Sequence, residues 1–135
     1  MIVPDAVARL QKMTLMPLLV AFGCIATGCT GGQALLPYQV MNGGNPQHGR
    51  QVIQEKGCGA CHTIPGIASA RGVVGPPLMF FSRRTMIAGE LPNSPDNLIR
   101  WIKDPKLVEP GTAMPDLGLS DQEARDVAAY LYTLR

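Results

Sequence analysis

Residues 57–62 read Gly57-Cys58-Gly59-Ala60-Cys61-His62, a pair of cysteines separated by two small residues and followed directly by a histidine. This segment brings two thiols and an imidazole close together. A zinc site would need two further ligands, and residues 45–135 contain no second Cys/His pair. A thioredoxin-like redox pair would need a βαβ context, which the sequence does not indicate. A disulfide between Cys58 and Cys61 is a further alternative, but it would leave His62 without a role.

The same pattern is typical of the covalent attachment of a c-type haem. Two thiols at this spacing can form thioether bonds with the vinyl groups on neighbouring pyrroles of one porphyrin. The next residue then lies beneath the iron, where an imidazole nitrogen can coordinate the metal. The sequence therefore predicts one covalently bound haem c, attached through Cys58 and Cys61 and with His62 as an iron ligand.

A six-coordinate iron needs a ligand on its other face, and methionine is the usual partner of histidine in electron carriers. Met114 lies in Pro110-Gly111-Thr112-Ala113-Met114-Pro115, where two prolines and a glycine prevent regular structure and stiffen the loop. Met79 and Met86 flank apolar or small residues and are expected to fill the core. The other histidine, His48, falls in a predicted helix. We therefore predict that Met114 is the second iron ligand.

Size and composition agree with a domain built around a cofactor. The chain has 135 residues, of which only 5% are aromatic, and its C-terminal part alone would form a marginal core. The 12 prolines and 15 glycines argue against long helices or a regular sheet. A net charge of +2 without a clustered basic face argues against a nucleic-acid-binding protein.

Three helices are expected from their start signals, and no stretch alternates well enough to predict a sheet. The signals are asparagine or serine N-caps, proline in the first turn and, in the last helix, a capping box formed with Glu123. The predicted helices run from Asn45-Pro46 to about Lys56, from Ser94-Pro95 to Pro105, and from Ser120 towards the C-terminus. The predicted fold is therefore all-α, with three to five helices wrapped around the haem in residues 45–135.

The N-terminal residues have the order of an export signal. Arg9 and Lys12 precede an apolar run over 15–25, which is shorter than the roughly 20 residues of a membrane-spanning helix, and small residues follow. We expect residues 1–28 to be an export signal and residues 29–44, rich in glycine, to be a flexible linker. An uncleaved membrane anchor is the alternative.

Residues 26–29, Ala26-Thr27-Gly28-Cys29, resemble the lipobox of bacterial lipoproteins, although leucine is commoner at the first of these positions. This resemblance implies a lipidated Cys29 at the mature N-terminus, which would hold the protein at a membrane surface. The alternative is that Cys29 is a small residue near an ordinary cleavage site.

Residues 49–134 resemble a class I cytochrome c. More narrowly, they resemble the cytochrome c domain fused to the copper-A subunit (subunit II) of some haem–copper terminal oxidases. The chain departs from this family in lacking a copper-A domain and in having Pro77-Leu78-Met79 where an Asp-Leu-Thr stretch is usual. The resemblance rests on residues 57–62, Gly75-Pro76-Pro77-Leu78, Ser82-Arg83-Arg84-Thr85, Leu91-Pro92-Asn93, residues 98–105 and residues 110–115.

The resemblance also implies roles for residues around the haem. The carbonyl of Pro76 would accept a hydrogen bond from the second imidazole nitrogen of His62 and fix its orientation. Arg83, with Arg84 as the alternative, would pair with a haem propionate. A further role falls to Trp101, which would pack beside the haem near the methionine loop.

The resemblance also implies that two helices pack closely at a glycine. Gly49 would let the first helix cross the last closely, near Tyr130. This contact concerns the fold and not the cofactor.

The expected function is electron transfer and not enzyme catalysis. The expected protein is a membrane-tethered monohaem carrier on the outer, periplasmic face of the bacterial cytoplasmic membrane. Its expected partners are respiratory redox proteins, namely a terminal oxidase and a quinol-oxidising complex. The alternatives are a fixed haem subunit of a larger respiratory complex, and a haem enzyme or sensor with a labile sixth ligand.

Overall fold

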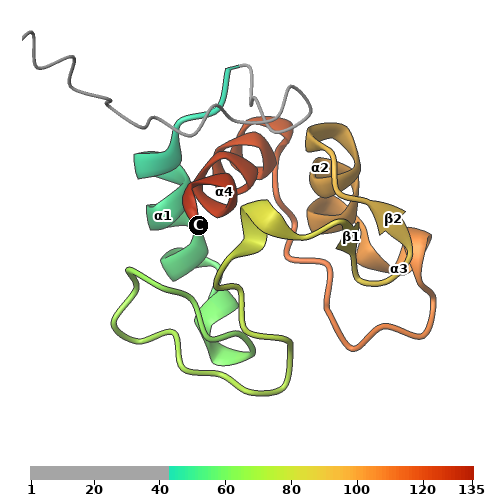
Figure 1. Ribbon diagram of the computed structural model, residues 1–135, viewed down its shortest axis with the longest axis horizontal. Helices are drawn as coiled ribbons and strands as arrows, with labels where there is room; N and C mark the ends of the chain where they lie inside the picture. Colours follow the sequence, from blue (N-terminus) through green and yellow to red (C-terminus); the bar gives the residue numbers. More distant parts are fainter. Residues whose placement is uncertain (1–42) are drawn as a thin grey trace, which may run out of the picture. The chain divides into compact units, whose positions relative to one another are not determined.

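Four α-helices supply most of the regular structure in residues 43–135, the part of the chain that this computed structural model describes. The all-α prediction is confirmed. The predicted export signal, Cys29 and nearly all of the linker lie outside the described residues. The helices are α1 (Pro46–Glu55), α2 (Pro95–Lys103), α3 (Pro105–Val108) and α4 (Asp121–Thr133), joined by the short 3-10 helices η2 (Cys58–Ala60) and η3 (Phe81–Arg83) (Figure 1).

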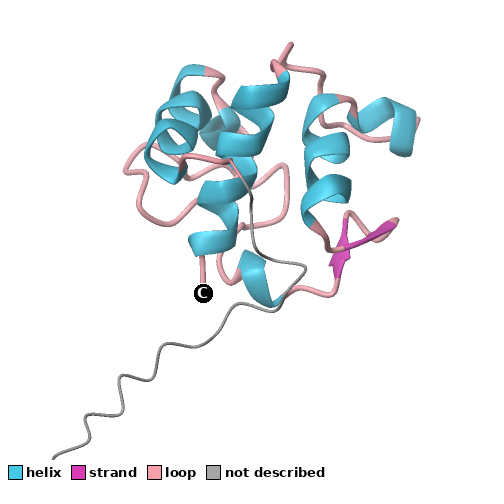
Figure 2. Ribbon diagram, turned by 90° about the horizontal axis from the view of Figure 1, so that it is seen from above, coloured by secondary structure: helices cyan, strands magenta, loops and turns pink. Residues whose placement is uncertain are grey.

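A small antiparallel pair of strands was not predicted. Strands β1 (Met86–Ile87) and β2 (Leu91–Pro92) pair with Ile87 opposite Leu91, and they lie before α2 (Figure 2). With two residues in each strand, no alternation of apolar and polar side chains could reveal them. Within residues 43–135, no helix is long and apolar enough to cross a membrane.

The predicted helix starts are confirmed. The side chain of Asn45 accepts hydrogen bonds from the backbone N–H groups of Gln47 and His48 at 3.0 and 3.2 Å. Ser120 and Glu123 form the predicted capping box at the start of α4. Pro105 follows the end of α2, as predicted, but it also opens α3, a four-residue helix that was not predicted.

The crossing of α1 and α4 depends on Gly49. A Cβ atom at this position would lie 1.9 Å from the carbonyl oxygen of Asp126 and 2.8 Å from the nitrogen of Val127. No side chain fits at that distance, so only glycine allows this approach. The crossing lies one turn before Tyr130, whose hydroxyl donates instead to the carbonyl of Pro65 at 2.6 Å.

Met79 and Met86 do not fill the core, so this prediction was wrong. Their side chains are 41% and 42% exposed. In each case a neighbour occupies the interior instead: Leu78 packs against the core beside Met79, and Ile87 is buried beside Met86. Methionine in an apolar context was therefore a poor guide to burial at these two positions.

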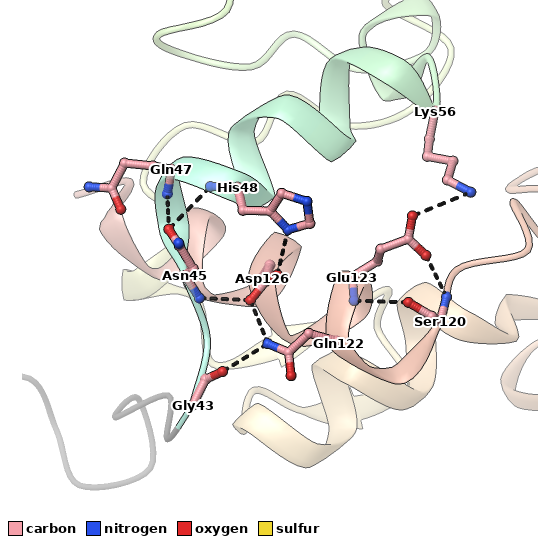
Figure 3. Close-up of polar contacts among 9 residues, drawn as sticks. All are labelled: Gly43, Asn45, Gln47, His48, Lys56, Ser120, Gln122, Glu123 and Asp126. Atoms are coloured by element: carbon pink, nitrogen blue, oxygen red, sulfur yellow. Dashed lines mark hydrogen bonds and ion pairs between the residues drawn. The ribbon is translucent and has the colours of Figure 1, made fainter.

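The buried carboxylate of Asp126, in α4, binds the start of α1 through hydrogen bonds (Figure 3). Asp126 is 2% exposed. Its Oδ1 accepts hydrogen bonds from the backbone N–H of Asn45 at 2.7 Å and from the side chain of Gln122 at 2.8 Å, and its Oδ2 lies 2.6 Å from Nδ1 of His48. Burial by itself would raise the pKa of Asp126, but these hydrogen bonds outweigh it and hold the pKa below its ordinary value.

Replacing this carboxylate gives a test that depends on pH. We expect Asp126→Asn to lower the free energy of unfolding by about 1–3 kcal/mol at neutral pH, because buried hydrogen-bonded donors lose a charged acceptor. The folded pKa of Asp126 lies below the unfolded value, so its contribution is complete above roughly pH 4 and is lost as the pH falls through the folded pKa.

Urea unfolding at a series of pH values measures this difference. The gap between wild type and variant should shrink in acid, whereas Glu55→Gln, at an exposed position of α1, should change stability by less than about 0.5 kcal/mol throughout. A gap that is the same at all pH values would contradict the role assigned to the ionised carboxylate.

Candidate functional site

One large cavity opens inside residues 43–135, with a volume of about 550 Å³. Its walls are mostly apolar, and its polar lining includes the residues of the cysteine motif. Arg84 and Glu109 are the only Asp, Glu, Lys or Arg side chains among the lining residues. The wall is built by the end of α1, η2, the loop 74–78, the segment 84–89, α2, the loop 109–117 and α4.

The cysteine motif forms one side of this cavity. Gly57 ends α1 in the left-handed conformation, with φ of 72°, and the chain then turns into η2. Cys58, Cys61 and His62 all line the cavity and are half-buried. The N–H of His62 donates to the carbonyl of Cys58 at 3.0 Å, and this bond fixes the backbone of His62 relative to that of Cys58. The three predicted residues thus share one site.

Cys58 and Cys61 are not joined by a disulfide in the structure. Burial raises the pKa of the Cys58 thiol. Within residues 43–135, no group of three or more His, Cys, Asp or Glu side chains could hold a metal ion such as zinc.

Gly59 lies where two loops approach closely. A Cβ at Gly59 would lie 2.7 Å from Cα of Ala70. The small residue is needed for packing between two loops.

His62 is held in one orientation by the backbone. Its Nδ1 donates a hydrogen bond to the carbonyl of Pro76 at 2.8 Å, as the resemblance implied. This bond fixes the proton on Nδ1 and leaves Nε2 with a lone pair for a metal. Gly75 makes the approach possible, since a Cβ there would lie 2.3 Å from Cε1 of the imidazole.

Met114 and Trp101 also line the cavity, and both are half-buried. Met114 lies in an irregular loop, as predicted, and its N–H donates to the hydroxyl of Thr112 at 3.2 Å. Of the two other methionines considered, Met86 lines the cavity and Met79 does not. The structure thus brings two thioethers to the cavity, of which only Met114 belongs to a loop stiffened by prolines.

The two adjacent arginines occupy different places. Arg84 lines the cavity, donates to the carbonyl of Pro77, and has its guanidinium 5.4 Å from the centre of the Phe81 ring. Arg83, to which the resemblance assigned the propionate, is not among the lining residues, and its guanidinium lies 5.5 Å from the ring centre of Phe80. The position of the alternative residue, Arg84, is the one that suits contact with a group in the cavity.

Asn93 was not predicted as a site residue, although it orders the segment that carries Arg84. It is buried, and its side-chain nitrogen donates to the carbonyls of Phe81 and Arg84 at 3.2 and 2.9 Å. Its Oδ1 accepts a hydrogen bond from the hydroxyl of Tyr132 at 2.8 Å. A buried asparagine whose partners lie in or directly after η3 and in α4 has no local pattern that reports these contacts.

The donor set and the lining fit haem c. The apolar walls suit a porphyrin, the two thiols and the imidazole lie on one side, and a thioether and a guanidinium line the same cavity. The thiols suit thioether bonds to vinyl groups, the imidazole and thioether suit the iron, and the guanidinium suits a carboxylate. These residues are therefore chemically matched to the parts of one covalently bound haem.

Comparison with known proteins gives an independent result. A family model for cytochrome c matches residues 46–135. The chain is 40% identical over 90 residues to cytochrome c oxidase subunit 2 of Alkalihalophilus pseudofirmus, which covers 64% of this chain and 25% of that protein. It is 32% identical over 93 residues to cytochrome c oxidase subunit 2 of Bacillus subtilis, covering 66% and 26%. The chain thus spans about a quarter of the length of these relatives.

Gly75→Ala tests the support of His62. We expect a low yield of haem-loaded protein, because the added Cβ would push the imidazole away from the Pro76 carbonyl. The ratio of haem absorbance to protein mass measures the yield. Ser69→Ala, at an exposed position of the same segment, should leave that ratio unchanged. A normal ratio for Gly75→Ala would show that the imidazole does not need this orientation.

Proposed function

The chain belongs to the cytochrome c family, and we propose that it carries single electrons within a respiratory chain, to or within a haem–copper terminal oxidase. Its cofactor is haem c, which is bound covalently in this family. When bound, this group supplies an iron that alternates between the ferrous and ferric states. The observation that carries the proposal is that Cys58, Cys61, His62 and Met114 line a single apolar cavity.

The residues of the cavity suit outer-sphere electron transfer. Cys58 and Cys61 would attach the cofactor, and His62, oriented by Pro76, would bind its iron. We propose that Met114 would supply the second ligand, so that neither oxygen nor a substrate could coordinate. The apolar lining excludes water, which lowers the cost of reorganisation when the charge changes. Methionine ligation and burial both favour a high reduction potential.

Arg84 and Trp101 are proposed to orient the cofactor. Arg84 is favoured over Arg83 as the partner of a haem propionate, because its guanidinium lines the cavity and Asn93 fixes its backbone. Trp101 lines the same cavity and would cover the cofactor near the methionine loop. These two side chains would thus limit both rotation of the group and the entry of water.

The names of the relatives support a terminal oxidase as the partner, since they are subunits of cytochrome c oxidase. The same names favour a second candidate, in which the chain is a fixed haem subunit of a larger membrane complex. Purification in mild detergent separates the two, because a tethered carrier comes away alone and a subunit brings its partners. The haem enzyme or sensor is the least favoured function, because the cavity contains a second candidate ligand in Met114.

We also propose that the protein is exported and tethered to the outer face of the cytoplasmic membrane. The support is the basic, apolar and small order of residues 9–28 and the lipobox-like residues 26–29. We expect the membrane-extracted protein to have the mass of residues 29–135 plus one haem and its acyl chains. Intact mass spectrometry measures this, and Cys29→Ser should release the protein from the membrane. A free N-terminus elsewhere would overturn the lipid anchor but not the electron carrier.

Met114→Ala tests the second iron ligand. We expect the weak charge-transfer band that a methionine–iron(III) bond gives at the red end of the visible spectrum to vanish. We also expect the reduction potential to fall, since the thioether favours the ferrous state. Redox titration with visible spectra measures both.

Met86→Ala is the matched control, because Met86 is the other methionine that lines the cavity. The Met86→Ala variant should keep the methionine–iron(III) charge-transfer band. Loss of the band in Met86→Ala and its retention in Met114→Ala would assign the ligand to Met86 instead.

A further inference from the structure

Within residues 43–135, Glu109 is the only acidic residue that lines the cavity. It is half-buried and lies directly before the loop that carries Met114. The other charged lining residue, Arg84, donates to backbone carbonyls. Its carboxylate differs from a lining that is mostly apolar.

The carboxylate closes the first turn of the methionine loop. Oε1 of Glu109 accepts a hydrogen bond from the N–H of Gly111 at 2.8 Å, and its backbone carbonyl accepts one from the N–H of Thr112 at 3.0 Å. The turn at Pro110 and Gly111 is therefore held both by the backbone and by the side chain of the same residue.

Hydrogen bonds also hold the chain on both sides of this turn. Upstream, the N–H of Glu109 donates to the carbonyl of Pro105 at 2.9 Å, which joins the turn to α3. Downstream, the hydroxyl of Thr112 accepts the hydrogen bond from the N–H of Met114. A continuous series of hydrogen bonds thus runs from α3 through Glu109 and Thr112 to Met114.

We propose that Glu109 is a positioning residue for Met114 and that its charge sets the reduction potential of the iron. This inference rests on the proposed function, in which Met114 is a ligand. The hydrogen bond to Gly111 holds the thioether in place, so that competing ligands displace it less easily. The negative charge, in a wall of low polarity, stabilises the more positive ferric iron and lowers the potential.

Two substitutions separate these effects. Glu109→Gln keeps an oxygen that can accept from Gly111 but removes the charge, and Glu109→Ala removes both. Glu55→Gln removes the same charge at an exposed position of α1 that does not line the cavity, so it controls for total charge. Each variant is purified as the haem-loaded protein. Redox titration gives its midpoint potential, and titration of the ferric form with imidazole gives its affinity for a competing ligand.

We expect Glu109→Gln to raise the midpoint potential, to keep the methionine–iron band and to leave imidazole affinity near that of wild type. Glu109→Ala should also raise the potential, and it should bind imidazole several-fold more tightly. Glu55→Gln should change neither quantity. If Glu109→Ala does not fold, Glu109→Gln still tests the charge, and Thr112→Val, which removes the acceptor of the Met114 N–H, tests the positioning.

The experiments can overturn the role of the charge and the positioning role separately. An unchanged potential in Glu109→Gln would overturn the role of the charge. Imidazole affinity in Glu109→Ala or Thr112→Val equal to that of wild type would overturn the positioning role. A wild-type spectrum without the methionine–iron band would overturn both this inference and the proposed ligation. A wild-type spectrum with the band, together with unchanged variants, would overturn this inference alone.

Discussion

The close contact between α1 and α4 at Gly49 is the constraint on which the site depends. It places α1 against the backbone of α4 at Asp126 and Val127. The end of α1 leads directly into η2 with the two cysteines, and α4 supplies Val127 and Leu131 to the cavity wall. A larger residue at Gly49 would therefore separate the segment that carries Cys58 and Cys61 from the helix that forms the opposite part of the contact. Function depends here on a glycine that touches no cofactor.

Around this crossing, much of the chain is irregular, and proline carbonyls act as fixed acceptors. A proline has a restricted φ and no N–H, so its carbonyl can be held in place by a loop that has no regular hydrogen bonding. Polar side chains that would otherwise be mobile gain a defined orientation in this way, including the proposed iron ligand His62. The pairs are Tyr130 with Pro65, His62 with Pro76, Arg84 with Pro77, and Asn97 with Pro92.

The features that could be predicted from the sequence are those that depend on neighbouring residues. The N-caps at Asn45 and Ser120 need only a few consecutive residues, and the structure has both of them. The features that were missed depend on tertiary contacts. Which of two adjacent arginines faces the cavity is decided by η3 and by the buried Asn93, and no local pattern reports this. For the same reason, the exposure of Met79 and the position of Glu109 could not be foreseen.

The cavity also bears on how this small domain is stabilised. Ile53, Leu98 and Ile102 are buried, yet they line the cavity as well, so the apolar core and the cofactor site share their side chains. A cofactor that occupies this space removes apolar surface from water on both sides of the contact, which adds to a core that is marginal by size. A cofactor attached through Cys58 and Cys61 would stay bound when the chain unfolds. In the folded chain it would complete the same apolar core to which Ile53, Leu98 and Ile102 belong.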